Sequence, residues 1–311
     1  PGQDEREIFK DLLKELLEIS NIVFTTINSS GNFIFDSLKH NISHLIIDES
    51  SQCYEIQCLL PLRLLPDKVI LIGDPSQLPA TTFSDFSLRT KFNIGLFERM
   101  IDNGYPYIML DTQYRMNNEI CSFPSSQFYE AKLKTHYLTI EKDKHYKWID
   151  EVKSHYFNSK SSVFVNVNGI TKNENTSFCN YYEIDMILKI LSFFPVSNYC
   201  NIGIISPYKH QCVEIRRIFQ TMNINDIVVN TVDGFQGKEK EIIIISLVKS
   251  LNNANTKENV SFINDSKRMN VTITRAKHLL ITIGNRNVVS SANNWNDFIY
   301  HIEENNSLIN E

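Results

Sequence analysis

The 311-residue sequence lacks any long apolar run. Its longest apolar stretch, in "EIIIISLV", is far shorter than the roughly 20 residues that span a bilayer. The first residues, "PGQDEREIFKDLLKELLEIS", carry charges where a signal peptide needs an apolar segment. We therefore predict a protein with no membrane partner.

The sequence also lacks a C-x-x-C pair and a Cys/His cluster with zinc-like spacing. We expect its six cysteines to be reduced core residues, as in a cytosolic or nuclear protein. A net charge of −5 argues against nucleic-acid binding by bulk attraction, although a local groove can still be basic. The cysteines are Cys53, Cys58, Cys121, Cys179, Cys200 and Cys212.

Short runs rich in Val and Ile recur along the chain, separated mostly by segments of helical length. This alternation predicts an α/β fold with mainly parallel sheets covered by helices, and no internal repeat is present. An amphipathic helix is expected at the start, from the spacing of Phe9, Leu12, Leu13, Leu16 and Leu17. The predicted strands are "NIVFTTI", "HLIID", "KVILIGD", "YIMLD", "SVFVNV", "NIGIIS", "DIVVNTV", "EIIIISLV" and "LLITIGN".

One strand-to-helix connection can be predicted in detail. The strand "NIGIIS" leads into "PYKHQCVEIRRIFQTM", where Ser206 is expected to cap the helix and Pro207 to occupy its first turn. The buried stripe of this helix is predicted to contain Ile215, Ile218, Phe219 and Met222.

Two other segments have no clear period. Residues 131–160 mix Lys, His, Tyr and Asp, which is compatible with a basic-aromatic nucleic-acid surface but more typical of a solvated excursion. Residues 250–260, "SLNNANTKENV", are polar and predict a loop between a strand and a helix.

Polar residues follow several of the predicted strands, and ligands of open α/β sheets bind beyond such carboxyl ends. Each of these residues alone is compatible with a solvated strand exit, but their recurrence indicates a site. The groups are Asp48 and Glu49; Asp74 and Gln77; Gln113, Tyr114 and Arg115; and Asp233 and Gln236.

The acids after "HLII" suit phosphate chemistry. An Asp in this position can hold Mg²⁺, and a neighbouring Glu can accept a proton from the attacking water. In "GDPSQLP", Gln77 can orient that water, and Asp74 with Pro75 can shape a rigid turn. An ordinary Asp-Pro turn is the alternative for this segment.

The pattern as a whole resembles the superfamily-one nucleic-acid helicases, within the branch of the nonsense-mediated-decay helicase and senataxin. "FPSSQFYEAKL" is more similar to senataxin, and the resemblance extends from about Asn21 to about Asn285. The segments that carry it, in order, are "DESSQ", "GDPSQLP", "DTQYRM", "TVDGFQGKEKEIIIIS" and "NDSKRMNVTITRAKHLLITIGN", which look like helicase motifs II to VI.

The resemblance implies ATP and Mg²⁺ as cofactors and gives each matching residue a role. Asp48 would hold Mg²⁺, Glu49 would be the general base, and Gln77 would couple nucleotide state to movement. Arg115 and Arg275 would reach the γ-phosphate, since Arg donates in a fork that Lys cannot reproduce.

The same resemblance gives three further residues a nucleotide-binding role. Tyr114 would stack on adenine, and Glu239, with Gly237 in the same segment, would bind the nucleotide and its ribose. A surface ion pair for Arg275 and a half-buried core aromatic for Tyr114 are the alternatives.

Nucleic acid is the implied partner, as single-stranded RNA or DNA, and protein partners are not indicated. Candidate contacts to the strand's backbone are Thr26 in the first domain and Pro207, Tyr208 and Thr231 in the second. Hydroxyls and backbone amides bind phosphate and sugar without reading sequence. Packing within a strand is the alternative for the threonines.

One expected motif is missing, because no G-x-x-x-x-G-K-[ST] occurs in the chain. "GFQGKEKE" has the wrong spacing, lacks the Ser or Thr, and leads into a strand. We therefore expect a helicase core with two RecA-like domains, the first truncated at its N-terminus (1–104) and the second at 105–311. We also expect the chain by itself to be inactive as an ATPase.

The resemblance implies a parent enzyme that is an ATP-dependent helicase or translocase, moving 5′ to 3′ on RNA, DNA or RNA–DNA hybrids, with a nuclear location favoured over a cytoplasmic one. A helicase-like scaffold without ATPase activity is the alternative. A plain single-strand-binding protein is a third possibility, which the acidic balance and the Mg²⁺-type acids disfavour.

Overall fold

The computed structural model describes the chain except residues 1–2, 83, 144–145, 175–176 and 251–261. Nearly all of the predicted loop at 250–260 lies outside the described residues. The chain divides into two compact units, Pro1–Ile108 (unit 1) and Met109–Glu311 (unit 2). Among the described residues, no helix is long and apolar enough to cross a membrane.

Unit 1 is built around a pair of parallel strands, β1 and β2. Their register runs from His44 opposite Lys68 to Ile47 opposite Leu71. The elements of unit 1 are α1 (Gln3–Ile19), η1 (Ser29–Gly31), η2 (Phe33–Leu38), β1 (His44–Ile47), η3 (Ser50–Gln52), α2 (Glu55–Leu62), β2 (Lys68–Leu71), α3 (Asp85–Arg89) and α4 (Leu96–Asp102).

The predicted opening helix and the strands in "HLIID" and "KVILIGD" are confirmed. The strand predicted for "NIVFTTI" is wrong, because this segment has no partner strand and runs as coil into η1. Along α1 the apolar stripe is mostly exposed, with Leu17 buried but Phe9 66% accessible.

Unit 2 contains a six-stranded sheet in which every neighbouring pair is parallel. The strand order is β12-β5-β11-β10-β8-β9, so consecutive strands are joined by crossovers. This arrangement confirms the predicted α/β fold class. The strands are β5 (Ser162–Asn166), β8 (Ile202–Ser206), β9 (Val228–Thr231), β10 (Lys240–Ser246), β11 (Ala276–Gly284) and β12 (Leu308–Asn310).

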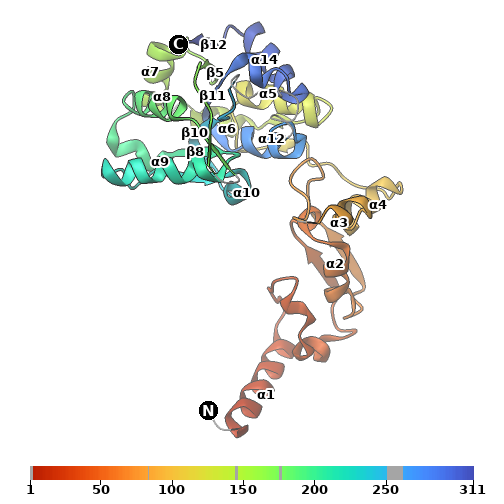
Figure 1. The fold of residues 1–311 in the computed structure, drawn as a ribbon. Coiled ribbons are helices and arrows are strands. Elements are labelled where there is room, and N and C mark those ends of the chain that lie inside the picture. Colours follow the sequence, from red (N-terminus) through yellow and green to blue (C-terminus); the bar gives the residue numbers. More distant parts are fainter. Residues whose placement is uncertain (1–2, 83, 144–145, 175–176, 251–261) are drawn as a thin grey trace. The chain divides into compact units, whose positions relative to one another are not determined.

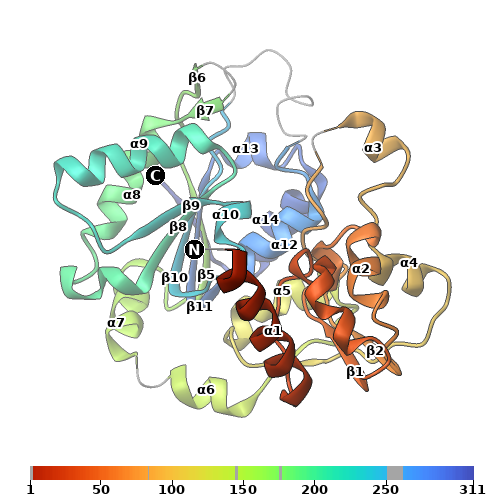
Figure 2. The ribbon, with the colours of Figure 1, turned by 90° about the horizontal axis from the view of Figure 1, so that it is seen from below.

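Helices cover both faces of this sheet, with α8 and α9 on one side and α5, α12 and α14 on the other (Figures 1 and 2). Two short strand pairs, β3 (Thr112–Gln113) with β4 (Lys134–Thr135) and β6 (Lys172–Glu174) with β7 (Ser177–Cys179), lie outside it. The helices are α5 (Asn118–Phe128), α6 (Tyr137–Asp143), α7 (Lys147–Tyr156), α8 (Tyr181–Leu191), η4 (Val196–Asn201), α9 (Lys209–Thr221), α10 (Val232–Phe235), α12 (Ser266–Ile273), α13 (Arg286–Val289) and α14 (Asn293–Glu304).

The continuous apolar run of β10 follows from this coverage. Ile242 and Ile244 join one core together with residues of α8 and α9, while Ile243 and Ile245 point to the opposite face. All four are fully buried. A strand covered on both faces needs no polar alternation, which is why the sequence shows a run of isoleucines.

Three details of unit 2 differ from the predictions. "YIMLD" is not a strand, because only the Thr112–Gln113 pair beyond it meets a partner. Helix α9 begins at Lys209 with Tyr208 at the N-cap, so Ser206 and Pro207 precede the helix instead of capping it. Its predicted stripe is buried at Ile215 and Phe219, whereas Ile218 is only partly buried and Met222 is 52% exposed.

Two further expectations need correction. Residues 131–160 are not simply a solvated excursion, because α7 buries Ile149 and Val152 in the main core. The cysteines are all free, but Cys200 is exposed and Cys53 only partly buried, so the prediction of core thiols holds for the other four.

Candidate functional site

In unit 1 the acids of "DESSQ" leave the sheet directly after β1. Glu49 has a left-handed backbone, with φ of 52°, and its amide donates to Asp48 Oδ1 over 3.0 Å. The Glu49 carboxylate accepts a hydrogen bond from Gln52 Nε2 at 2.7 Å. Both acids are exposed, and Asp48 Oδ2 has no hydrogen-bond partner among the described residues.

Hydrogen bonds join this turn to the exit of β2. The amide and the hydroxyl of Ser50 both donate to Ile72 O at 2.8 Å, and the Asp74 amide donates to Ser51 Oγ at 3.2 Å. A Cβ at Gly73 would lie 2.9 Å from Ser51 N, so the close approach of the two exits requires glycine. "DESSQ" and "GDPSQLP" are thereby held side by side.

Asp74 organises the second of these turns. Its carboxylate accepts from the Ser76 amide at 2.9 Å and from Gln77 Nε2 at 2.8 Å. The predicted rigid Asp-Pro turn is present, and it fixes the side chain of Gln77 within unit 1.

In unit 2, three predicted residues converge before the first residues of β10 and β11. Arg115 donates to Glu239 Oε2 at 2.6 Å and to Thr274 O at 3.3 Å. Arg275 donates to Val271 O at 2.9 Å and to Thr274 Oγ1 at 3.2 Å. Segments more than 100 residues apart in sequence therefore meet around Thr274, and we call Arg115, Glu239, Thr274, Arg275 and Lys277 the amino-edge cluster.

The "QYR" turn is held rigidly against the sheet. Gln113 accepts from the amides of Arg115 and Met116 at 2.8 Å and donates to Thr135 Oγ1 at 2.6 Å. Asn117, which caps α5, bonds to the main chain of β11 at Lys277 and His278. These bonds set the position of Arg115 next to Glu239.

Tyr114, in the same turn, is 66% exposed, so it is not the half-buried core aromatic considered above. Its ring lies 4.5 Å from that of His136, which lies 4.4 Å from the ring of Tyr137. This exposed face can stack with a planar ligand. Arg275, in contrast, is only 2% exposed, so it is neither a surface ion pair nor a freely projecting finger in this structure.

Sequence reasoning missed the acids and bases that surround Glu239. Lys277 lies 3.1 Å from both Glu239 and Glu241, and His278 lies 2.8 Å from Glu241. Burial alone would raise the pKa of each of these glutamates, but their hydrogen bonds to cationic side chains lower it below the ordinary value. The sequence does carry a signal for this cluster. The acids of "EKE" (239–241) and the bases of "KH" (277–278) both occur where a strand begins, and these two strands, β10 and β11, are neighbours in the sheet.

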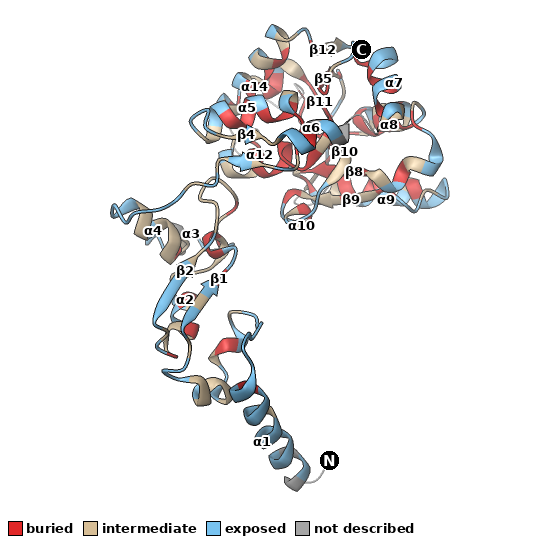
Figure 3. Ribbon diagram, turned by 180° about the vertical axis from the view of Figure 1, so that it is seen from behind, coloured by how far each residue is buried: buried red, intermediate tan, exposed pale blue. Residues whose placement is uncertain are grey.

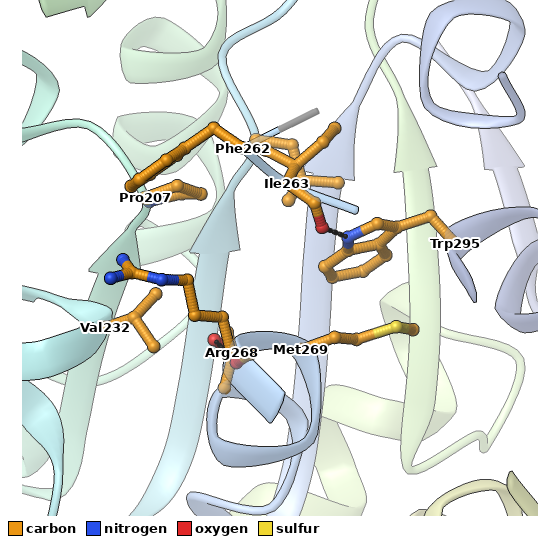
Figure 4. Close-up of a pocket in the computed structure, with 9 residues that line it drawn as sticks. Pro207, Val232, Phe262, Ile263, Arg268, Met269 and Trp295 are labelled. Carbon is orange, nitrogen blue, oxygen red and sulfur yellow. Dashed lines mark hydrogen bonds between the residues drawn. The ribbon is translucent and has the colours of Figure 1, made fainter. Parts of the chain in front are cut away.

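The nucleic-acid candidates of unit 2 lie at the other end of the same sheet. Pro207 and Tyr208 follow β8, and Thr231 ends β9 and accepts from the Gly234 amide at 3.3 Å. Pro207 lines a pocket with Phe262, Arg268 and Trp295 (Figure 4). The Arg268 guanidinium lies 4.7 Å from the Phe262 ring and pairs with Asp233 at 3.0 Å.

The candidate site residues of unit 2 therefore lie at both ends of the sheet. Glu239 and Arg275 precede their strands, whereas Pro207, Tyr208 and Thr231 follow theirs. Because the strands are parallel, these groups lie at opposite edges of the sheet, separated by a strand length of about 20 Å. Gly237 lies beside the first group with φ of +74°, a conformation that favours glycine.

Thr26 is not in a strand as predicted. It lies in an exposed turn, where its hydroxyl bonds to Ser29 Oγ at 2.8 Å.

The donor set for Mg²⁺ is small. No group of three or more His, Cys, Asp or Glu side chains suited to a metal occurs in the described part of the chain. Mg²⁺ is commonly held by one or two carboxylates together with phosphates and water, and the exposed Asp48 carboxylate with its open Oδ2 fits that mode.

Comparison with known proteins agrees with this arrangement. Residues 2–85 and 92–287 each match a family model described as an AAA domain, and the second match alone covers more than half of the chain.

Among similar curated proteins, Helicase SEN1 of Saccharomyces cerevisiae is 34% identical over 94% of this chain and 13% of its own length. An uncharacterized ATP-dependent helicase of Methanocaldococcus jannaschii is 36% identical over 94% of this chain and 43% of its own. A regulator of nonsense transcripts 1 homolog of Neurospora crassa is 30% identical over 99% of this chain and 28% of its own. The chain thus spans less than half the length of each of these relatives. The chain belongs to the AAA-domain family and, by its similarity to helicases such as SEN1, to the senataxin-like superfamily-one helicases.

Proposed function

We propose that this chain forms part of an ATP-dependent helicase or translocase, in which each unit carries residues that act on nucleotide. The observation that carries the proposal is the amino-edge cluster, which gathers Arg115, Glu239 and Arg275 from three distant segments. Two guanidinium groups and one carboxylate beside an exposed aromatic face suit a nucleoside triphosphate better than an uncharged ligand.

Within unit 2, Arg115 and Arg275 would be the cations for the terminal phosphates, and Arg275 would have to leave its hydrogen bonds to Val271 O and Thr274 Oγ1 to reach them. Tyr114, with its exposed ring, would stack on the adenine, while Glu239 and the main chain at Gly237 would bind the ribose. Arg115 donates to Glu239 at 2.6 Å, and a bound nucleotide would replace Glu239 as the partner of this guanidinium.

Within unit 1, the acids would act on the water and the metal. Asp48 would hold Mg²⁺, which neutralises phosphate charge when bound. Glu49 would accept the proton of the attacking water, and Gln77 would orient that water from a side chain fixed by Asp74.

The chain by itself is proposed to hydrolyse ATP only negligibly. It contains no G-x-x-x-x-G-K-[ST] motif, and that motif supplies the amide cradle and the Lys for the β- and γ-phosphates. Turnover would then require a cradle supplied by additional sequence.

Nucleic acid is proposed to bind as a single strand of RNA or DNA, with Pro207, Tyr208 and Thr231 contacting its backbone in unit 2 and Thr26 in unit 1. Unwinding of RNA or RNA–DNA hybrids in the 5′-to-3′ direction and a nuclear location are proposed from the resemblance of the motifs to the senataxin branch, and two relatives are named as a helicase and a regulator of nonsense transcripts.

The test is Glu49→Gln in the full-length protein, with Glu15→Gln on the exposed side of α1 as the control. We expect the first variant to bind ATP but to lose RNA-stimulated phosphate release by about 10²-fold or more, and to retain poly-U in the presence of ATP. The control should hydrolyse ATP normally. Normal turnover by Glu49→Gln would make Glu49 a solvated strand exit, and a full-length protein without any turnover would favour the scaffold alternative.

A further inference from the structure

Lys249 is a buried lysine with no counter-charge among the described residues. It follows β10 and is 2% exposed. Its Nζ lies 3.2 Å from the centre of the Phe178 ring and 5.3 Å from that of Tyr208, and among the described residues no carboxylate or other acceptor pairs with it. Burial lowers the pKa of this amine to about 8.

Tyr208 adds a second donor that lacks an acceptor. The side chain is 7% exposed, and its hydroxyl has no hydrogen-bond partner in the described part of the chain. A buried donor left unpaired is unfavourable, and a buried unpaired charge more so. An ammonium and a phenol hydroxyl, neither of which has an acceptor within the described ranges of the chain, therefore lie together at the carboxyl edge of the sheet.

The backbone is strained where it presents Lys249. Val248 has φ of 71°, a rare value for a β-branched residue. The Lys249 amide donates to Leu247 O at 2.8 Å, which closes a tight three-residue turn around Val248. Strain of this kind persists only where the surroundings enforce it, and it is concentrated at functional sites.

Three buried polar side chains enforce this turn. Glu183 accepts from the Val248 amide at 2.9 Å, while Val248 O accepts from Thr171 Oγ1 at 2.7 Å and from Asn180 Nδ2 at 3.0 Å. Both main-chain polar groups of Val248 are thus fixed by side chains. Thr171 directly precedes β6, Asn180 directly precedes α8, and Glu183 lies in α8. These hydrogen bonds fix the main chain directly before Lys249 and so restrict the position of its side chain.

We propose that Lys249 and Tyr208 form an anion-binding site that takes a phosphate group of the single strand's backbone. The proposal rests on the proposed nucleic-acid function and adds its charged contact. A phosphate supplies acceptors for both unpaired donors, and Pro207 and Thr231 lie at the same edge of the sheet. An uncharged ligand would leave the ammonium without a counter-charge.

Phe262 lies next to this site, and its side chain is exposed enough to move. Its ring lies 5.7 Å from that of Tyr208 and is 44% exposed, and Arg268 lies against it (Figure 4). Rotation of an exposed side chain occurs within nanoseconds, so a shift of Phe262 can admit a phosphate to the donors behind it.

The experiment measures binding of a fluorescent ten-residue oligouridylate to the 311-residue chain by anisotropy at several salt concentrations. Lys249→Met keeps the apolar stem on Phe178 and removes the charge, and Tyr208→Phe keeps the ring and removes the hydroxyl. Lys147→Met, an exposed lysine of α7, is the matched control. Thermal unfolding of each variant, with and without inorganic phosphate at matched ionic strength, gives a readout independent of nucleic acid.

We expect Lys249→Met to weaken binding by about 10-fold and to reduce the slope of log affinity against log salt by about 0.7, the value for one phosphate contact on a single strand. Tyr208→Phe should weaken binding by a few-fold with an unchanged slope, and the control should match the wild type. Without nucleic acid, Lys249→Met should unfold at a higher temperature, since it removes a buried unpaired charge.

Other outcomes overturn the proposal. If Lys249→Met unfolded at a lower temperature and bound oligouridylate with unchanged affinity, Lys249 would only stabilise the fold by packing on Phe178. The proposed function would be unaffected. Stabilisation of the wild type by inorganic phosphate without any effect of Lys249→Met on oligouridylate binding would show a site for small anions only. Absence of oligouridylate binding by the wild type would remove both this proposal and the proposed nucleic-acid contacts.

Discussion

The two units stabilise their motifs by different means. Unit 2 buries a six-stranded sheet on both faces, and Ile204, Ile244 and Ile281 have no accessible surface. Unit 1 has a two-stranded sheet in which Ile46 is 58% and Ile70 43% exposed. Figure 3 shows the same contrast, with buried residues concentrated along the strands of unit 2 and α1 of unit 1 largely exposed.

The difference shows that motif geometry does not require a large core. In unit 1 the two loops after β1 and β2 are aligned by hydrogen bonds of Ser50 and Ser51 and by the close approach at Gly73. In unit 2 the distance between Arg115 and Glu239 depends on a packed sheet that brings together residues 124 positions apart. Local bonds suffice for neighbours in sequence, whereas distant segments need a core.

The largest expected effect is on the core of unit 2. Ile244→Ala should lower the free energy of unfolding of this unit by about 2–5 kcal/mol, because it leaves a cavity in a close-packed sheet. Ile70→Ala in unit 1 should cost about 1 kcal/mol or less, since Ile70 is already 43% exposed.

Both tryptophans, Trp148 and Trp295, belong to unit 2, so their fluorescence during urea unfolding reports this unit alone. Hydrogen exchange of β1 and β2 reports unit 1. Equal losses for the two variants would refute the contrast between the units.

A smaller effect should appear in the pH dependence of the free energy of unfolding of unit 2. Burial raises the pKa of Glu183 from its ordinary 4.5 to about 8. Between these values the folded state holds a proton that the unfolded state releases, so stability falls as pH rises, by up to about 1.4 kcal/mol per pH unit. Glu183→Gln removes this contribution and should flatten the curve.

The measurement is urea unfolding followed by tryptophan fluorescence from pH 5 to pH 8, with Glu151→Gln, at an exposed position of α7, as the control. The stability of Glu183→Gln relative to wild type should rise across this range, while the control should run parallel to wild type. A parallel curve for Glu183→Gln would mean that Glu183 is ionised in the folded protein.

The smallest effect concerns the local bonds of unit 1. Ser50→Ala removes one hydroxyl bond to Ile72 O, but the Ser50 amide still donates to the same oxygen at 2.8 Å. We expect a loss of about 0.5–1.5 kcal/mol, confined to the "DESSQ" and "GDPSQLP" loops. Hydrogen exchange of these loops measures it, and a loss that spread to α1 or α4 would show that unit 1 unfolds as one block.

The strands of unit 2 were predictable because their isoleucine and valine runs match burial on both faces. "YIMLD" and "NIVFTTI" have similar composition but form no strands, because a strand exists only where another strand offers hydrogen bonds. Helix α9 begins two residues later than predicted, at Lys209, although the Ser206 hydroxyl still accepts from the Tyr208 amide at 3.3 Å just before it.

By itself, the sequence determined the fold class, the order of the helicase motifs and the identity of the groups that those motifs carry, since these depend on short-range patterns. Only the tertiary structure decided that Glu239 and Arg275 lie at the amino edge of the sheet and that Arg275 is buried. It alone placed the Lys249 ammonium over the Phe178 ring. Burial and pairing depend on side chains from distant segments, and no local pattern in the sequence specifies which of these segments will meet.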